Sequence, residues 1–230
     1  GATVGRNANR LKDACFKLNN IVYHLSANEG KNQLHGGIHG FDSHIWNCVM
    51  QEHLISFYRN SEHMEEGFPG LMRVTVNFEL TSTNELQITY TAMSEEDTLV
   101  NLTNHAYFNL GGYASGTILD HELCLDISDY LRTDDKLIPT GELASVAGTP
   151  FDFRTPRTVG EKLGGEVTGY DHNFILRGAP LCDVCGRQLA LAATVANAAN
   201  SPLKHLFNGM LSEDMMGEEA DSVKYEDSLG

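Results

Sequence analysis

Two neighbouring stretches of alternating apolar and polar residues constrain most strongly what this chain can fold into. Residues 71–80 read LMRVTVNFEL, so that every second residue from Met72 to Leu80 is apolar. Residues 85–92 read ELQITYTA and resume the alternation after the polar residues 81–84. A period of two is typical of a strand with one packed and one wet face, which is common in antiparallel sheets. The two stretches therefore predict an antiparallel pair of strands joined by a short turn.

Other segments indicate further strands. Residues 13–25 predict a β-hairpin, because Asn19-Asn20 stands between two strand-like runs and asparagine tolerates the positive φ angles of a tight turn. Residues 117–127 alternate in the same way and predict another strand, and 188–196 predict one near the end of the chain.

The remaining segments predict little regular structure. Glycines interrupt 30–42, and prolines and glycines interrupt 130–154, so both are expected to be irregular. Thr155-Pro156 is a suitable start for one short helix through Leu163. Many strands with at most one or two short helices predict an all-β fold, a large antiparallel β-sandwich. We assign it to residues 1–211, followed by an acidic, disordered tail over 212–230.

Charge and cysteine usage narrow the partners and the compartment. With 16 basic against 31 acidic residues, the net charge of −15 argues against nucleic acid and against an anionic membrane surface. The 5 cysteines are an odd number, in a chain large enough to fold without disulfides. We see neither a secretory signal nor an apolar run of the roughly 18–20 residues that a membrane span needs. These features predict a cytoplasmic protein with reduced thiols.

Histidines and cysteines in short spacings raise the question of a metal. His35, His39 and His44 have a ligand-like spacing, but Gly36-Gly37 interrupts the helix that such a site would need. The Cys182–Cys185 pair has no second pair, so a surface turn is the favoured interpretation. We therefore expect neither a metal nor a cofactor.

The stretch Asn101–Asn109, NLTNHAYFN, combines short hydrogen-bonding side chains with the aromatic rings of Tyr107 and Phe108 around His105. A site for a neutral, hydroxyl-rich ligand needs both properties. A well hydrogen-bonded strand end with a structural histidine would have the same composition. The residues alone leave both interpretations open.

Six longer motifs resemble one family. They are GRNANR with Asn9-Arg10, NQLHGGIHGFD with His35, EEGFPG (65–70), NLTNHAYFNLGG with His105, LIPTGELASVAGTPFDFR (137–154) and GYDHNF with Asp171. In order and spacing they are similar to the aldose 1-epimerases, or galactose mutarotases. The resemblance extends over residues 1–178 and weakly over 188–207, and it implies a chain truncated at both ends relative to that family.

The resemblance implies a large antiparallel β-sandwich with a sugar cleft and an enzyme that interconverts the α and β anomers of free aldohexoses such as galactose and glucose. His105 would be the general acid, a role that imidazole, with a pKa of about 6.5, can fill near neutral pH. His35, Asp171, Asn9 and Arg10 would bind the sugar. No cofactor is implied, and a monomer is favoured.

The family's general base is a glutamate in a late strand, in a Leu-Glu-Thr-Gln-like setting. This sequence has no comparable motif, since its glutamates after Asp171 (213, 218, 219 and 226) lie in the acidic tail. The alternative interpretation is therefore a non-catalytic sugar-binding relative, or an inactive fragment without its base.

Overall fold

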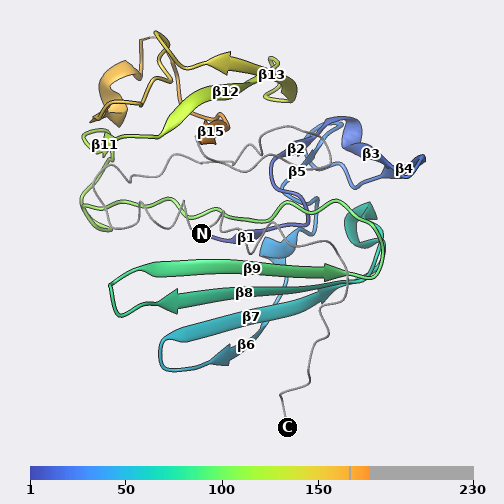
Figure 1. Ribbon diagram of the computed structural model, residues 1–230. Helices are drawn as coiled ribbons and strands as arrows, with labels where there is room; N and C mark the ends of the chain where they lie inside the picture. Colours follow the sequence, from blue (N-terminus) through green and yellow to red (C-terminus); the bar gives the residue numbers. More distant parts are fainter. Residues whose placement is uncertain (166, 177–230) are drawn as a thin grey trace.

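The computed structural model describes residues 1–165 and 167–176, and these residues form an all-β structure (Figure 1). Its fifteen strands are short, and no α-helix occurs in this described part of the chain. The strands are β1 (Thr3–Val4), β2 (Arg10–Leu11), β3 (Cys15–Leu18), β4 (Ile21–His24), β5 (Gln33–Leu34), β6 (Asn47–Met50), β7 (Leu54–Ser61), β8 (Met72–Leu80), β9 (Leu86–Ser94), β10 (Thr103–Asn104), β11 (Glu122–Leu123), β12 (Ile127–Thr133), β13 (Pro139–Ser145), β14 (Arg157–Thr158) and β15 (Phe174–Leu176). Four 3₁₀ segments are η1 (Lys12–Ala14), η2 (Phe41–Ser43), η3 (Glu65–Gly67) and η4 (Val159–Lys162).

The largest sheet is antiparallel and follows chain order, β6-β7-β8-β9. Its last two strands are the two alternating stretches, paired from Met72 opposite Ser94 to Leu80 opposite Leu86. The turn over 81–84 ends at Asn84, whose φ of 61° is left-handed, and the amide of Thr81 donates to the carbonyl of Glu85 at 2.8 Å. The predicted antiparallel pair is thus confirmed.

One face of this sheet forms a core, but only over half of its length. Met72, Val74 and Val76 are fully buried and pack with Phe41 and Tyr90. The alternation continues to Leu80, yet Leu80 is 56% exposed at the far end of the hairpin. The sequence pattern therefore predicted the face correctly and overstated how far it is covered.

A second core packs against the sheet β13-β12-β15. In Figure 1 this sheet lies on the opposite side of the molecule from the sheet β6-β7-β8-β9. Its fully buried members are Leu123, Ile127, Val146, Phe153, Val159 and Phe174. Here two predictions were wrong. Of the expected strand over 117–127, only Glu122–Leu123 (β11) and Ile127 (the first residue of β12) lie in strands, and the expected irregular segment 130–154 contains most of β12 and all of β13.

Proline and glycine explain the second error. Pro139 begins β13, which is an edge strand, where a missing amide donor costs no ladder hydrogen bond. Gly141 has a φ of 84°, and the β12–β13 register shifts between Leu131 and Thr133, as at a β-bulge. The residues that suggested a loop instead shape a curved hairpin.

The short helix expected over 155–163 is replaced by β14 and η4. Arg157 and Thr158 pair with β11, so the helical turn starts only at Val159 and is a 3₁₀ segment. None of the helical segments in the described part is long or apolar enough to cross a membrane.

The N-terminal third positions the GRNANR and NQLHGGIHGFD motifs through three small ladders. The predicted hairpin over 13–25 is confirmed as β3 and β4, with Asn19 and Asn20 at φ values of 48° and 63°. Strand β1 pairs with β10. Strand β2 pairs with β5, and the two are labelled next to each other in Figure 1. The strand expected over 188–196 and the tail over 212–230 lie outside the described residues.

Met72→Ala should lower the free energy of unfolding by about 2–5 kcal/mol, because it leaves a cavity in a fully buried position of β8. Gln87→Ala, at an exposed position of β9, should change it by less than about 0.5 kcal/mol. Urea unfolding monitored by circular dichroism measures both. Equal effects of the two substitutions would contradict this assignment of the core.

Candidate active site

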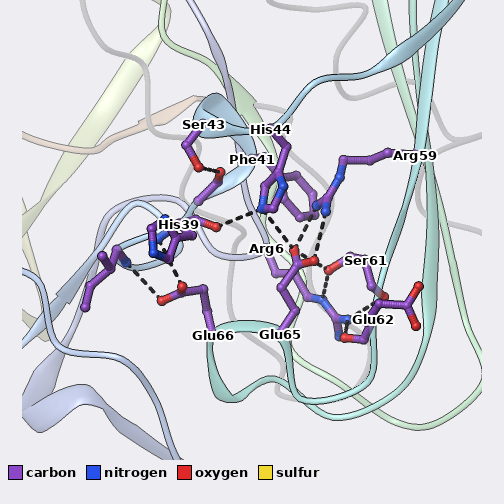
Figure 2. A network of polar contacts seen from close by, with 12 residues as sticks. Arg6, His39, Phe41, Ser43, His44, Arg59, Ser61, Glu62, Glu65 and Glu66 are labelled. Carbon is purple, nitrogen blue, oxygen red and sulfur yellow. Dashed lines mark hydrogen bonds and ion pairs between the residues drawn. The ribbon is translucent and has the colours of Figure 1, made fainter.

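A buried arginine anchors the GRNANR segment. The Arg6 guanidinium donates from Nε to the Ser61 hydroxyl at 2.8 Å, and one terminal nitrogen donates to the carbonyls of Ser61 and Glu62 at 2.7–2.8 Å (Figure 2). The other terminal nitrogen donates to the Pro69 carbonyl at 2.7 Å. Only 2% of the residue is exposed, and this burial lowers the pKa of Arg6 to about 10. The charge is stable there because each of the three guanidinium nitrogens donates to an oxygen acceptor.

A second pair of charged side chains, Arg59 and Glu65, lies next to Arg6 (Figure 2). The Glu65 carboxylate accepts two hydrogen bonds from Arg59, each 2.8 Å, and a third from the Ser61 hydroxyl. Burial alone would raise the pKa of Glu65, but these donors outweigh it and lower the pKa. The segment 65–70 therefore has a structural role, because it closes over the arginine that fixes the N-terminal strands.

Asn9 and His35 hold each other across the two chain segments. Both have left-handed backbones, with φ values of 64° and 54°. The Asn9 amide donates to His35 Nδ1 at 3.1 Å, and the His35 amide donates to the Asn9 carbonyl at 3.2 Å. A backbone amide can only donate, so neutral His35 must carry its ring proton on Nε2. The ring is thereby presented with a defined donor, Nε2–H.

His105 lies directly against His35. Its amide donates to the Ala2 carbonyl at 2.8 Å, immediately after the β1–β10 ladder. The two imidazole centroids are 5.0 Å apart with an interplanar angle of 89°, and the Tyr107 ring lies 5.3 Å from His105. Two segments separated by 70 positions thus bring both histidines together.

Arg10 and Asp171 lie beside this pair. Arg10 donates to both carboxylate oxygens of Glu29 at 2.8 Å, and its third nitrogen lies 4.0 Å from Asp171 Oδ2. The Asp171 side chain is 73% exposed, just before β15. All five residues that the sequence singled out, Asn9, Arg10, His35, His105 and Asp171, therefore belong to one neighbourhood.

The charges around His35 set its protonation. Burial lowers the pKa of His35, and the neighbouring His105 and Arg10 lower it further, which outweighs the opposite effect of Asp171 and Asp42. His35 is therefore predominantly neutral at neutral pH.

The three histidines of the 35–44 segment do not converge. His35 faces His105, whereas His44 Nε2 lies 3.1 Å from the His39 carbonyl and 3.9 Å from Glu65. Within residues 1–165 and 167–176, no group of three or more His, Cys, Asp or Glu side chains is arranged to hold a metal ion.

A hollow of about 300 Å³ lies between η1 and the β12–β13 turn. It is lined by Lys12, Lys31, Asn32, Asp134, Asp135, Lys136 and Ile138. None of the five singled-out residues lines it, so this hollow is separate from the histidine pair.

The part of the chain that contains the six motifs matches known proteins. The family model described as aldose 1-epimerase matches residues 1–207. The chain belongs to the aldose 1-epimerase family. It is 44% identical over 188 residues to the galactose mutarotase of Homo sapiens, covering 81% of this chain and 55% of that protein. It is 39% identical over 183 residues to the aldose 1-epimerase of Escherichia coli K12, covering 77% and 53%.

Solved structures agree with the fold. A GalM/aldose epimerase homologue from C. elegans matches with a TM-score of 0.70 at 32% identity, over 76% of this chain and 54% of that one. The galactose 1-epimerase of Lactobacillus acidophilus matches equally well, with a TM-score of 0.70 at 32% identity, over 76% and 55%. The all-β, antiparallel fold class is thus confirmed as that of aldose 1-epimerases. The chain spans about half the length of the relatives it matches.

Sequence reasoning missed the residues that hold this epimerase-like site in place. Arg6 and Glu29 bond to groups 19 to 63 positions away, and Glu65 supports Arg6 through Arg59 and Ser61. The only available signal was that Arg6 and Glu65 stand inside two of the matching motifs. Their partners are visible only in the folded chain.

Arg6→Met should lower the free energy of unfolding by about 3–5 kcal/mol, because it leaves the buried carbonyl oxygens of Ser61 and Pro69 without their donor and removes one of the two arginines next to Glu65. Arg73→Met, at an exposed position of β8, should change it by less than about 0.5 kcal/mol. Urea unfolding compares the two. A loss below 1 kcal/mol for Arg6→Met would contradict the anchoring role.

NMR titration should find the pKa of His35 below the ordinary value of about 6.5, and His105→Ala should raise it by removing the neighbouring imidazole and admitting water. Because folding lowers this pKa, the unfolded chain binds more protons here. The stability contributed by neutral His35 is therefore present above about pH 6.5 and lost as the pH falls below it. His53→Ala, at an exposed position, is the control and should leave the His35 titration unchanged.

Proposed function

We propose that this chain is an aldose 1-epimerase that interconverts the α and β anomers of free aldohexoses, galactose and glucose among them. The observation that carries this proposal is the His35–His105 pair, with 5.0 Å between ring centroids and the His35 proton fixed on Nε2 by the Asn9 amide. Family membership indicates the reaction type. The histidine pair supplies two imidazoles that can donate a proton or a hydrogen bond to the ring oxygen of a sugar.

Anomer exchange opens the sugar ring and closes it on the other face of C1. The ring oxygen must gain a proton while the C1 hydroxyl loses one. In this proposal His105 donates the proton to the ring oxygen and recovers it on closure. His35 donates a hydrogen bond from Nε2 to the same oxygen, which stabilises the charge that changes there.

The remaining residues would orient the sugar. Asp171 is exposed and accepts hydrogen bonds from hydroxyl groups, while Arg10 presents the nitrogen that faces Asp171. Glu29 holds the other two nitrogens of Arg10, so the guanidinium is fixed before a sugar arrives. Such a fork binds a neutral sugar as a set of directed donors.

The reaction also needs a base for the C1 hydroxyl. In the family this is a glutamate on a late strand, and the glutamates that follow Asp171 in this sequence lie outside the described residues. The assignment of the acid side of the reaction to His105 stands independently of which carboxylate serves as the base.

We further propose a cytoplasmic monomer that requires no cofactor. Cys15, Cys48 and Cys124 are free thiols in the structure, as expected in a reducing compartment. Sedimentation of the chain at several concentrations tests the monomer.

Polarimetry on freshly dissolved α-D-galactose tests the activity. The chain should accelerate the optical change, and His105→Ala should lower kcat by roughly 10²–10⁴-fold, the usual contribution of a general acid or base. His121→Ala, a histidine of the following loop outside the site, should retain most of the activity. Saturable galactose binding without any acceleration would instead identify a non-catalytic sugar-binding relative and overturn the proposal.

A further inference from the structure

Glu66 reaches from the 65–70 segment to the loop that carries His35. One carboxylate oxygen accepts the amide hydrogen of Ile38 at 2.9 Å, and the other accepts that of His39 at 3.0 Å. Figure 2 shows the Glu66 carboxylate directed at the backbone beside His39. The two oxygens of one side chain therefore hold two successive amides of the loop.

Glu66 is itself held on its own side. Its carbonyl accepts the Ser26 amide at 3.1 Å and the Gln33 side-chain amide at 3.4 Å. Gln33 is 1% exposed and lies in β5, two residues before His35. The carboxylate thus extends from a fixed backbone, so it can impose a position on the loop.

Two glycines of the loop lie too close to neighbouring atoms to carry a side chain. A side chain at Gly37 would collide with the Glu66 carboxylate, and one at Gly36 would collide with the Gly5 carbonyl. Both glycines also have left-handed backbones, with φ values of 92° for Gly36 and 109° for Gly37. The loop after His35 is therefore enclosed between the N-terminal segment and Glu66.

We propose that Glu66 is a positioning residue that holds the His35 ring against His105 by binding the amides of Ile38 and His39. The backbone of the loop is also held where the Gly37 amide donates to Leu34, the Phe41 amide donates to Gly5, and the His39 carbonyl lies 3.1 Å from His44 Nε2. The Glu66 contacts at residues 38 and 39 secure the middle. The catalytic consequence rests on the function proposed above, whereas the effect on His35 does not.

A carboxylate is required for chemical reasons. Glutamine has one acceptor oxygen, so Glu66→Gln retains one of the two bonds and turns an NH₂ donor toward the other amide. Aspartate keeps two acceptors on a side chain shorter by one methylene. Glu62→Gln is the matched control, because Glu62 is an exposed glutamate four residues before Glu66 and contacts Arg6 through its backbone carbonyl, not through its carboxylate.

The experiment follows the ¹⁵N signals of the His35 ring in the full chain. In Glu66→Gln the pKa of His35 should rise toward about 6.5 as the ring gains water, and the preference for the Nε2–H tautomer should weaken. Mutarotation should lose about 10–10²-fold in kcat, with a smaller change in galactose affinity, as expected for misplacement by about 1 Å. Glu66→Asp should recover part of both effects, and Glu62→Gln should match the unsubstituted chain.

Unchanged His35 signals and kcat in folded Glu66→Gln would overturn the proposal. If the variants fail to fold, hydrogen exchange in the unsubstituted chain tests the proposal instead. The Ile38 and His39 amides, although their residues are exposed, should be protected, and exchange at unfolded-chain rates would overturn it. If the unsubstituted chain does not mutarotate galactose, the proposed function fails while these NMR measurements still decide the role of Glu66.

Discussion

The buried guanidinium of Arg6 is the interaction on which the arrangement of the other elements depends. It binds the end of β7 and the Pro69 carbonyl, and so joins the first strand to segments 55 to 63 residues away. A buried cation without acceptors would be very unfavourable, so the chain has few alternative ways to satisfy it. The same contacts fix the backbone of residues 7–10, whose neighbours include the carbonyl of Asn101. The positions of His35 and His105 therefore both depend on the segment that Arg6 anchors.

The site is then assembled by backbone geometry that is uncommon for side-chain-bearing residues. Asn9 and His35 both have positive φ values, and each satisfies the other's backbone. Such conformations are retained where surrounding contacts impose them, and they are frequent at functional sites. Here Arg6 fixes one side and Glu66 contacts the loop on the other. The orientation of the His35 ring follows from the Asn9 amide at Nδ1 together with these two supports.

The sequence predicted what is local and missed what is distant. Alternation identified β8 and β9, and Asn19-Asn20 identified the β3–β4 hairpin, because period and turn chemistry are properties of neighbouring residues. Pro139 and Gly141 misled, since an edge strand with a bulge accepts both. The five residues of the candidate site were proposed from motif resemblance, and they lie in one neighbourhood of the structure. Glu29, Arg6 and Glu66 were not, because their roles are defined by partners far along the chain.

The electrostatics of the site divide the work between the two histidines. Two imidazolium ions with centroids 5.0 Å apart would repel each other, so the pair favours at most one proton beyond neutrality. Burial and Arg10 disfavour that proton on His35, and the Asn9 amide occupies the nitrogen that would have to receive it. His35 is therefore suited to donate a constant hydrogen bond from Nε2. In the proposed reaction, the exchange of a proton with the ring oxygen is therefore assigned to His105, which lies beside Tyr107 and next to His35.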